Sequence, residues 1–139
     1  MAKPRRALKV RLPMYAYPRN AWRRKIHEAV SLALGKAAVQ YTAKDRIDLS
    51  IRLYFEGAKL KIVDIDNRVK DVFDALQGHV GGTGKKVRAL HPLIPNDCQI
   101  YRVTAEKCLP PKQSHGHGHL VIRNYRDRFQ GRRQRTPPR

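Results

Sequence analysis

Cysteine is scarce in this chain of 139 residues, because only Cys98 and Cys108 are present. Two cysteines exclude a disulfide framework, and neither has the neighbouring cysteine or histidine of a zinc motif. Long apolar runs are also missing, since none approaches the roughly 18 residues that span a bilayer. The basic N-terminus lacks the apolar segment of a secretory signal. We therefore expect a cytoplasmic protein with no membrane association.

Acidic residues are few, with 11 Asp and Glu against 30 Lys and Arg, for a net charge of +19. The excess is largest at both ends, but the segment 12–110 is basic as well. Such a charge attracts polyanions and supplies affinity by neutralising phosphates, which favours a nucleic-acid partner. From charge alone, a DNA enzyme and a ribosomal-type RNA-binding protein fit equally well. No segment pairs a basic face with a bulky apolar one, as a membrane-surface helix does.

The length fits one domain with a single core. We expect a basic N-terminal arm over residues 1–6, a folded domain over 7–125 and a basic tail over 126–139. The tail is rich in Arg, Gln and Pro and has little apolar surface to bury, so it is predicted to be disordered.

Apolar residues alternate with polar ones over 8–12 and 49–55, the period of a half-buried strand, and residues 59–65 extend or return the second strand. Spacings of three and four predict a helix over 21–40, with Asn20 as its N-cap. The same spacing from Asn67 to near Gly78 predicts a second helix.

A long loop over 78–95 follows, and then a terminal hairpin formed by strands over 99–107 and 119–125. This order of elements predicts an α/β (α+β) fold, a single small domain with a mixed β-sheet and two main helices.

Four of the eleven acids lie between residues 64 and 74. Carboxylates repel DNA phosphates unless a divalent cation lies between them, and Mg²⁺ prefers such oxygen ligands. Asp64 and Asp66 share one side if the chain is extended there, so they can share an ion. Asp66 is alternatively a helix-capping residue. Asp71 and Asp74 lie farther round the helix and are expected to be surface or capping residues.

Lys70 lies four residues beyond Asp66 and therefore on roughly the same helix face. It either pairs with Asp74 on the surface or holds the scissile phosphate and stabilises charge in the transition state.

These residues carry a resemblance through Asp64-x-Asp66-Asn67-x-x-Lys70, Phe73-Asp74-Ala75-Leu76 and Asn96-Asp97-x-Gln99. The pattern resembles the RusA family of Holliday junction resolvases over about 7–125. The resemblance implies a small α/β domain that forms a homodimer and nicks four-way DNA junctions symmetrically with Mg²⁺, for which Mn²⁺ can substitute. It implies metal binding by Asp64, Asp66 and Asp97 and a catalytic role for Lys70.

Two features depart from the family pattern. Asn96 stands where the family commonly has a second acid, and the 78–95 loop is longer than in compact members. Basic side chains of this loop and of the two helices are candidate DNA contacts: Arg23, Arg24, Arg68, Lys85, Lys86 and Arg88.

Two alternatives to junction resolution remain open from the sequence. One is a non-catalytic, basic nucleic-acid-binding protein whose acids only cap helices and pair with Arg. The other is a nuclease of the same chemistry that prefers flaps or forks.

Three further motifs carry less weight. The glycines at 81–84 lack the Walker pattern, so no nucleotide cofactor is expected. His115, His117 and His119 alternate with glycine and read as a polar turn more readily than as metal ligands. Trp22, with Tyr15 and Tyr17, either stacks on unpaired bases or belongs to the core.

Overall fold

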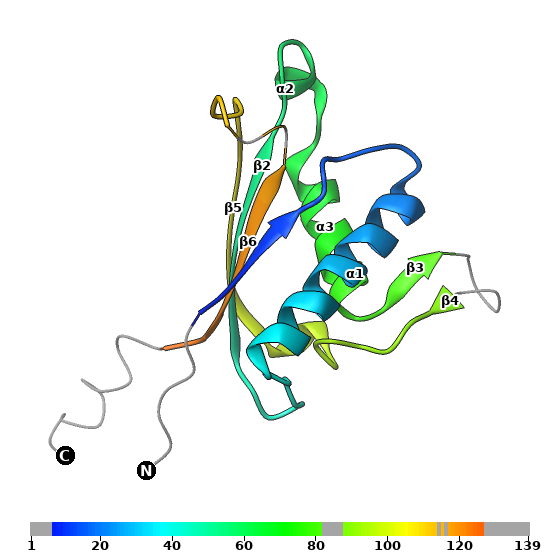
Figure 1. Cartoon of the computed structure of the whole chain (residues 1–139), viewed down its shortest axis with the longest axis vertical. Coiled ribbons are helices and arrows are strands. Elements are labelled where there is room, and N and C mark those ends of the chain that lie inside the picture. The colour runs from blue at the N-terminus through cyan, green and yellow to red at the C-terminus, as the bar shows by residue number, and fades with distance from the viewer. Residues whose placement is uncertain (1–6, 82–87, 114, 116, 127–139) are drawn as a thin grey trace, which may run out of the picture.

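The segments with period-two alternation build a four-stranded sheet in the computed structural model (Figure 1), which describes residues 7–81, 88–113, 115 and 117–126. The predicted N-terminal arm and nearly all of the predicted tail lie outside these residues. The elements, in chain order, are β1 (Leu8–Leu12), α1 (Arg19–Ala37), β2 (Ile47–Tyr54), α2 (Lys59–Ile62), α3 (Ile65–Leu76), β3 (His79–Gly81), β4 (Arg88–Ala89), the 3-10 helix η2 (Asp97–Gln99), β5 (Ile100–Cys108) and β6 (Gly118–Asn124).

The strand order in the sheet is β1-β6-β2-β5. The β2–β5 pair is parallel, whereas β6 runs antiparallel to both β1 and β2. The sheet is therefore mixed, and with two long helices it confirms the predicted α/β (α+β) class. The predicted terminal hairpin is wrong, because β2 lies between β5 and β6. Alternation along a segment shows that it is a strand, but it does not show which other strand lies beside it. Here the longest strand, β5, lies at the edge of the sheet.

Helices α1 and α3 lie side by side on one face of the sheet (Figure 1). Buried side chains of α1 recur every three or four residues, from Trp22 and Ile26 to Val30 and Leu34, and meet the inward-facing residues of β1, β2 and β6. The indole of Trp22 donates to the Pro13 carbonyl at 2.9 Å. Trp22 is thus a core residue, and its buried N–H is satisfied.

The helical segments differ from the sequence prediction at several positions. The residue before α1 is Pro18, without a side-chain cap, so Asn20 lies inside the helix. Residues 59–62 form the short helix α2 rather than a strand. Helix α3 begins two residues earlier than expected and is followed by Gly78 at φ +86°, where a Cβ would overlap the Leu90 carbonyl.

The opposite face of the sheet is not covered by any helix among the residues that the structure describes (Figure 1). Within the same residues, no helix has both the length and the apolar composition needed to span a membrane.

The two cysteines differ in environment. Cys98 is exposed, whereas Cys108 is partly buried at the end of β5. Burial, and then the nearby Glu106 carboxylate, raise the pKa of the Cys108 thiol.

We therefore expect iodoacetamide to modify Cys98 faster than Cys108 at pH 8, because the thiolate is the reactive form and burial lowers both its fraction and its access. Mass spectrometry of peptides from the native protein measures the two rates. Unfolding in denaturant should bring the rates together, and equal rates in the native protein would contradict the placement of Cys108.

Candidate functional site

The acidic motif lies at the N-terminus of α3. Asp64 has an extended backbone and is the N-cap residue, and Asp66 is in the first helical turn. The extended segment that would put both carboxylates on one side is therefore not formed. Both carboxylates are nevertheless exposed within the first turn, where the backbone N–H groups and the helix dipole favour negative charge.

Contacts from two other elements fix this helix start. Lys107, near the end of β5, donates from Nζ to the Val63 carbonyl at 2.7 Å. The Val63 N–H in turn donates to the Lys59 carbonyl at 3.0 Å, which joins α2 to the residue before Asp64. The sheet edge and α2 thus set where α3 begins.

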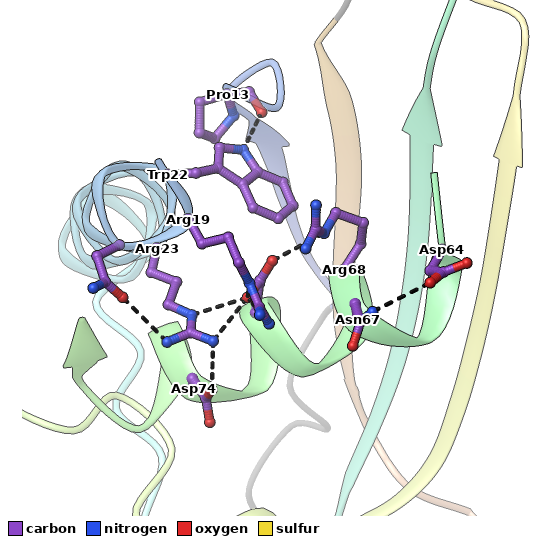
Figure 2. A network of polar contacts seen from close by, with 10 residues as sticks. Pro13, Arg19, Trp22, Arg23, Asp64, Asn67, Arg68 and Asp74 are labelled. Carbon is purple, nitrogen blue, oxygen red and sulfur yellow. Dashed lines mark hydrogen bonds and ion pairs between the residues drawn. The ribbon is translucent and has the colours of Figure 1, made fainter. Parts of the chain in front are cut away.

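The Asp64 carboxylate has one side-chain partner in its own helix. Asn67 donates from Nδ2 to Asp64 Oδ2 at 3.4 Å, a weak contact that orients the carboxylate across the first turn (Figure 2). Lys70 is exposed and lies four residues beyond Asp66 on the same helix. The motif therefore presents two carboxylates, one amide and one ammonium to solvent.

Four other acids of this basic chain are paired with arginine. Glu106 pairs with Arg52, and Asp48 lies 3.7 Å from Arg102. Asp74 pairs with Arg23 at 3.1 Å, which rules out its predicted pairing with Lys70 as its main contact. Within the described part of the chain, neither Asp64 nor Asp66 forms an ion pair.

Asp71 is the most heavily contacted acid, and it is completely buried. Arg19 and Arg23, one turn apart on α1, both donate to its Oδ1, with Nε distances of 3.0 and 2.9 Å (Figure 2). Arg68 Nε lies 2.9 Å from Oδ2, out of line for a hydrogen bond, so this contact is an ion pair. The hydrogen bond to Asp71 raises the pKa of Arg19. The expectation that Asp71 is a surface or capping residue is wrong.

Arg68 is held on its other side by an aromatic ring. Its guanidinium lies 4.2 Å from the centre of the Tyr15 ring, and Tyr15 packs edge-on against Trp22 at 4.9 Å. Cation–π contact and burial both favour this position of the guanidinium. Tyr15 is thus packed into the fold, whereas Tyr17 is 87% exposed.

These contacts change the set of candidate DNA-binding residues. Arg68 is buried and Arg23 is engaged by Asp71 and Asp74, so both serve the packing of α1 on α3. Arg24 is exposed on α1. Lys85 and Lys86 lie outside the described residues, and of Arg88 only the backbone, in β4, is described.

Asp97 lies far from the Asp64–Asp66 pair. It is in η2, just before β5, at the end where Ile100 pairs with Ile47, whereas Lys107 and Val63 meet at the other end. From Ile100 to Lys107 the strand covers roughly 23 Å. The structure therefore brings Asp64 and Asp66 together but not Asp97.

Asn96 has a structural role beside Asp97. Its side chain accepts from the Cys98 N–H at 3.1 Å, and its own N–H donates to Gln99 Oε1 at 2.9 Å, which is a capping box. The buried Gln99 donates from Nε2 to the carbonyls of Thr42 and Asp45. These contacts anchor the start of β5 to the loop before β2.

A largely apolar cleft of about 480 Å³ borders the start of α3. Its lining includes Met14, Tyr17, Tyr54 and Phe55, and it reaches Val63, the residue before Asp64. Among the described residues, which include His115, His117 and His119, no group of three or more His, Cys, Asp or Glu is placed to hold an ion.

Comparison with protein-family models and with curated proteins finds no match to this chain. The resemblance to the RusA family therefore rests on the motif itself.

Sequence reasoning missed the Asp71 cluster, although a signal for it exists. Asp71 precedes Val72 and lies four residues before Ala75, so it falls within the buried stripe of α3. A carboxylate in that stripe needs cationic partners, and Arg19, Arg23 and Arg68 were available at helical spacing.

Replacing Asp71 with alanine should destabilise the protein by about 3 to 5 kcal/mol, because it removes the buried counter-charge that three neighbouring guanidinium groups share. Urea denaturation followed by tryptophan fluorescence measures the change, since Trp22 lies in the adjoining core.

Asp74→Ala is the matched control. It removes a partly exposed carboxylate with Arg23 as its ion-pair partner and should cost about 1 kcal/mol or less. Equal losses in the two variants would show that Asp71 does not hold the helices together.

Proposed function

We propose that this protein is a Mg²⁺-dependent endonuclease that acts on branched DNA, with Asp64 and Asp66 as the metal-binding carboxylates. One observation carries the proposal: Asp64 and Asp66 lie within one helical turn, both exposed and without an ion pair among the described residues, whereas four other acids are paired with arginine. They are therefore available to a cation that the protein itself does not supply.

The donor set suits Mg²⁺. This ion is usually bound through one or two carboxylates, with water and substrate phosphate completing its shell. Asp64 and Asp66 supply two carboxylates in one helical turn, and Asn67 supports Asp64.

In this proposal the metal, the two carboxylates and the lysine have separate roles in phosphodiester hydrolysis. Bound Mg²⁺ supplies Lewis acidity and neutralises phosphate charge. Asp64 and Asp66 would hold it at the N-terminus of α3, and Lys70, one turn along, would contact the scissile phosphate. The adjoining apolar cleft, with the exposed Tyr17, offers a surface on which an unpaired base at a branch can stack.

Junction resolution further requires two active sites. A homodimer with twofold symmetry would present two Asp64–Asp66 pairs to opposing strands of a four-way junction and nick them symmetrically. This part of the proposal rests on the resemblance to the RusA family. A same-chemistry nuclease with flaps or forks as substrate uses the same pair and differs only in the assembly.

The proposal predicts that Asp66→Asn lowers Mg²⁺-dependent nicking of a labelled synthetic four-way junction by about 100-fold or more, because it weakens the hold on the metal. Binding of the uncleaved junction should stay equal or become tighter, since one negative charge near the phosphates is removed.

Glu28→Gln, on the exposed surface of α1, makes the same change of charge and should leave nicking unaltered. A fork and a linear duplex tested beside the junction separate the substrates. Wild-type protein that binds all three but nicks none with Mg²⁺ or Mn²⁺ would instead favour the non-catalytic, nucleic-acid-binding alternative.

Asp97→Asn tests the role that the family resemblance implies for Asp97. Because Asp97 lies at the far end of β5 from Asp64 and Asp66, we expect a much smaller loss of nicking than in Asp66→Asn. Single-turnover rates on the same junction compare the two variants. An equal loss would mean that Asp97 reaches the metal in the DNA-bound assembly.

A further inference from the structure

One whole face of the sheet carries no helix in the described part of the chain. Helices α1 and α3 pack on the other side, and Figure 1 shows that the side of the sheet facing away from them is uncovered. We call the uncovered side the open face. Since side chains alternate along a strand, the residues of the open face are those between the buried core positions of β1, β2 and β6, together with their neighbours on β5.

Strand register arranges these side chains in rows across the sheet. Arg11 on β1 lies opposite His119 on β6, which lies opposite Arg52 on β2. In the row beside it, Lys9 lies opposite Val121. Neighbouring strands are roughly 4.8 Å apart, so Arg11 and Arg52, two strands apart, lie about 10 Å from one another.

Exposed cations outnumber acids on the open face. Five exposed cations lie on it: Lys9, Arg11, Arg52, Arg102 and Arg123.

The same strands place two acids on the open face, and each is paired with a cation. Glu106 binds Arg52, and Asp48 lies near Arg102. Five cations and two acids leave an excess of three positive charges on this face.

A shallow hollow of about 370 Å³ lies within the same surface. Ser50 and Thr104 line it beside Arg52 and Arg123, and Arg123 donates from Nη1 to Ser50 Oγ at 2.9 Å. Hydroxyl and guanidinium groups are the usual protein partners of phosphate oxygens. The hollow thus combines positive charge with neutral hydrogen-bond donors, as a surface that binds a sugar–phosphate backbone does.

We propose that the open face binds the sugar–phosphate backbone of a DNA duplex, as a surface separate from the Asp64–Asp66 site. A polyanion neutralises the excess charge and gains affinity by counterion release. A second copy of this chain would instead bring two positive faces together, which is unfavourable. The observed charge therefore favours DNA as the occupant.

The two surfaces lie on opposite sides of the sheet, because α3 packs on the helix-covered side. One protomer can then contact one duplex segment at the start of α3 and another at the open face. Branched DNA supplies two such segments in one molecule. The identity of the polyanion as branched DNA rests on the proposed function, whereas the binding itself needs no cleavage.

The test removes three charges from the open face with Lys9→Gln, Arg11→Gln and Arg123→Gln in one protein. Its matched control removes three exposed lysines elsewhere, with Lys25→Gln, Lys36→Gln and Lys44→Gln. Junction affinity is measured by fluorescence anisotropy in EDTA over a range of salt concentrations, so that nuclease activity plays no part.

The open-face variant should bind at least about 10-fold more weakly at 0.1 M salt, and its logarithmic salt slope should fall by about two to three. The control should lose less than about threefold. A second variant, Thr104→Lys, adds a charge to the open face and should bind more tightly with a steeper slope, a gain that misfolding cannot produce.

Equal losses in the two triple variants would overturn the proposal, because net charge alone would then explain binding. Unchanged affinity in the open-face variant would also overturn it. A shift from dimer to monomer in sedimentation would overturn it in favour of a subunit interface. Nicking is a separate readout that tests only the proposed nuclease. Asp66→Asn should lose nicking and keep this salt dependence of binding. A wild-type protein that does not nick would contradict the proposed nuclease and leave the test of the open face unchanged.

Discussion

A buried carboxylate surrounded by arginines connects the two long helices of this protein. Asp71 of α3 takes both Arg19 and Arg23 from successive turns of α1, and Arg68 approaches its second oxygen while resting on Tyr15. An isolated buried charge is costly, so each member of this cluster requires the others. The cluster sets how α3 lies against α1, and therefore where the first turn of α3 presents Asp64 and Asp66. The candidate site depends on a contact made one to two turns away from it.

The same chain uses its acids in two ways. Asp71, Asp74, Asp48 and Glu106 are neutralised by arginines and stabilise the fold, whereas Asp64 and Asp66 are kept at a helix N-terminus without such a partner among the described residues. Backbone N–H groups and the dipole offset the repulsion between the two carboxylates there. That arrangement stabilises the helix start and also leaves oxygen ligands exposed, so one feature serves both folding and the proposed chemistry. The basic open face on the other side of the sheet adds a second place for DNA without competing with the first.

Local patterns predicted much of the fold. The strand over 8–12, the amphipathic stripes of both helices and the mixed-sheet class follow from periodicity, because burial on one face imposes a period of 2 or 3.6 regardless of the partner. The errors arose where the structure of a segment depends on which distant segment it packs against. Residues 59–62 form a helix, and β5 pairs with β2 rather than with β6. The local sequence of these short segments determines neither outcome. The helix start at Ile65 also depends on Lys107, which binds the Val63 carbonyl from a distant strand.

The sequence by itself determined the excess of positive charge, the position of the Asp64-x-Asp66-Asn67-x-x-Lys70 motif and the existence of the two helices, because these depend on composition and on neighbours a few residues away. Only the tertiary structure decided that Asp71 is buried among three arginines, that Arg23 and Arg68 serve packing, and that Asp97 lies at the opposite end of β5 from the acidic pair. The contacts of Arg19 and Arg23 with Asp71 join residues 52 and 48 positions apart, and the place of Asp97 depends on the direction of a strand, so the helical stripe that contains Asp71 reveals neither. The physical reason is that the cost of burying a charge depends on which distant cations the fold brings to it.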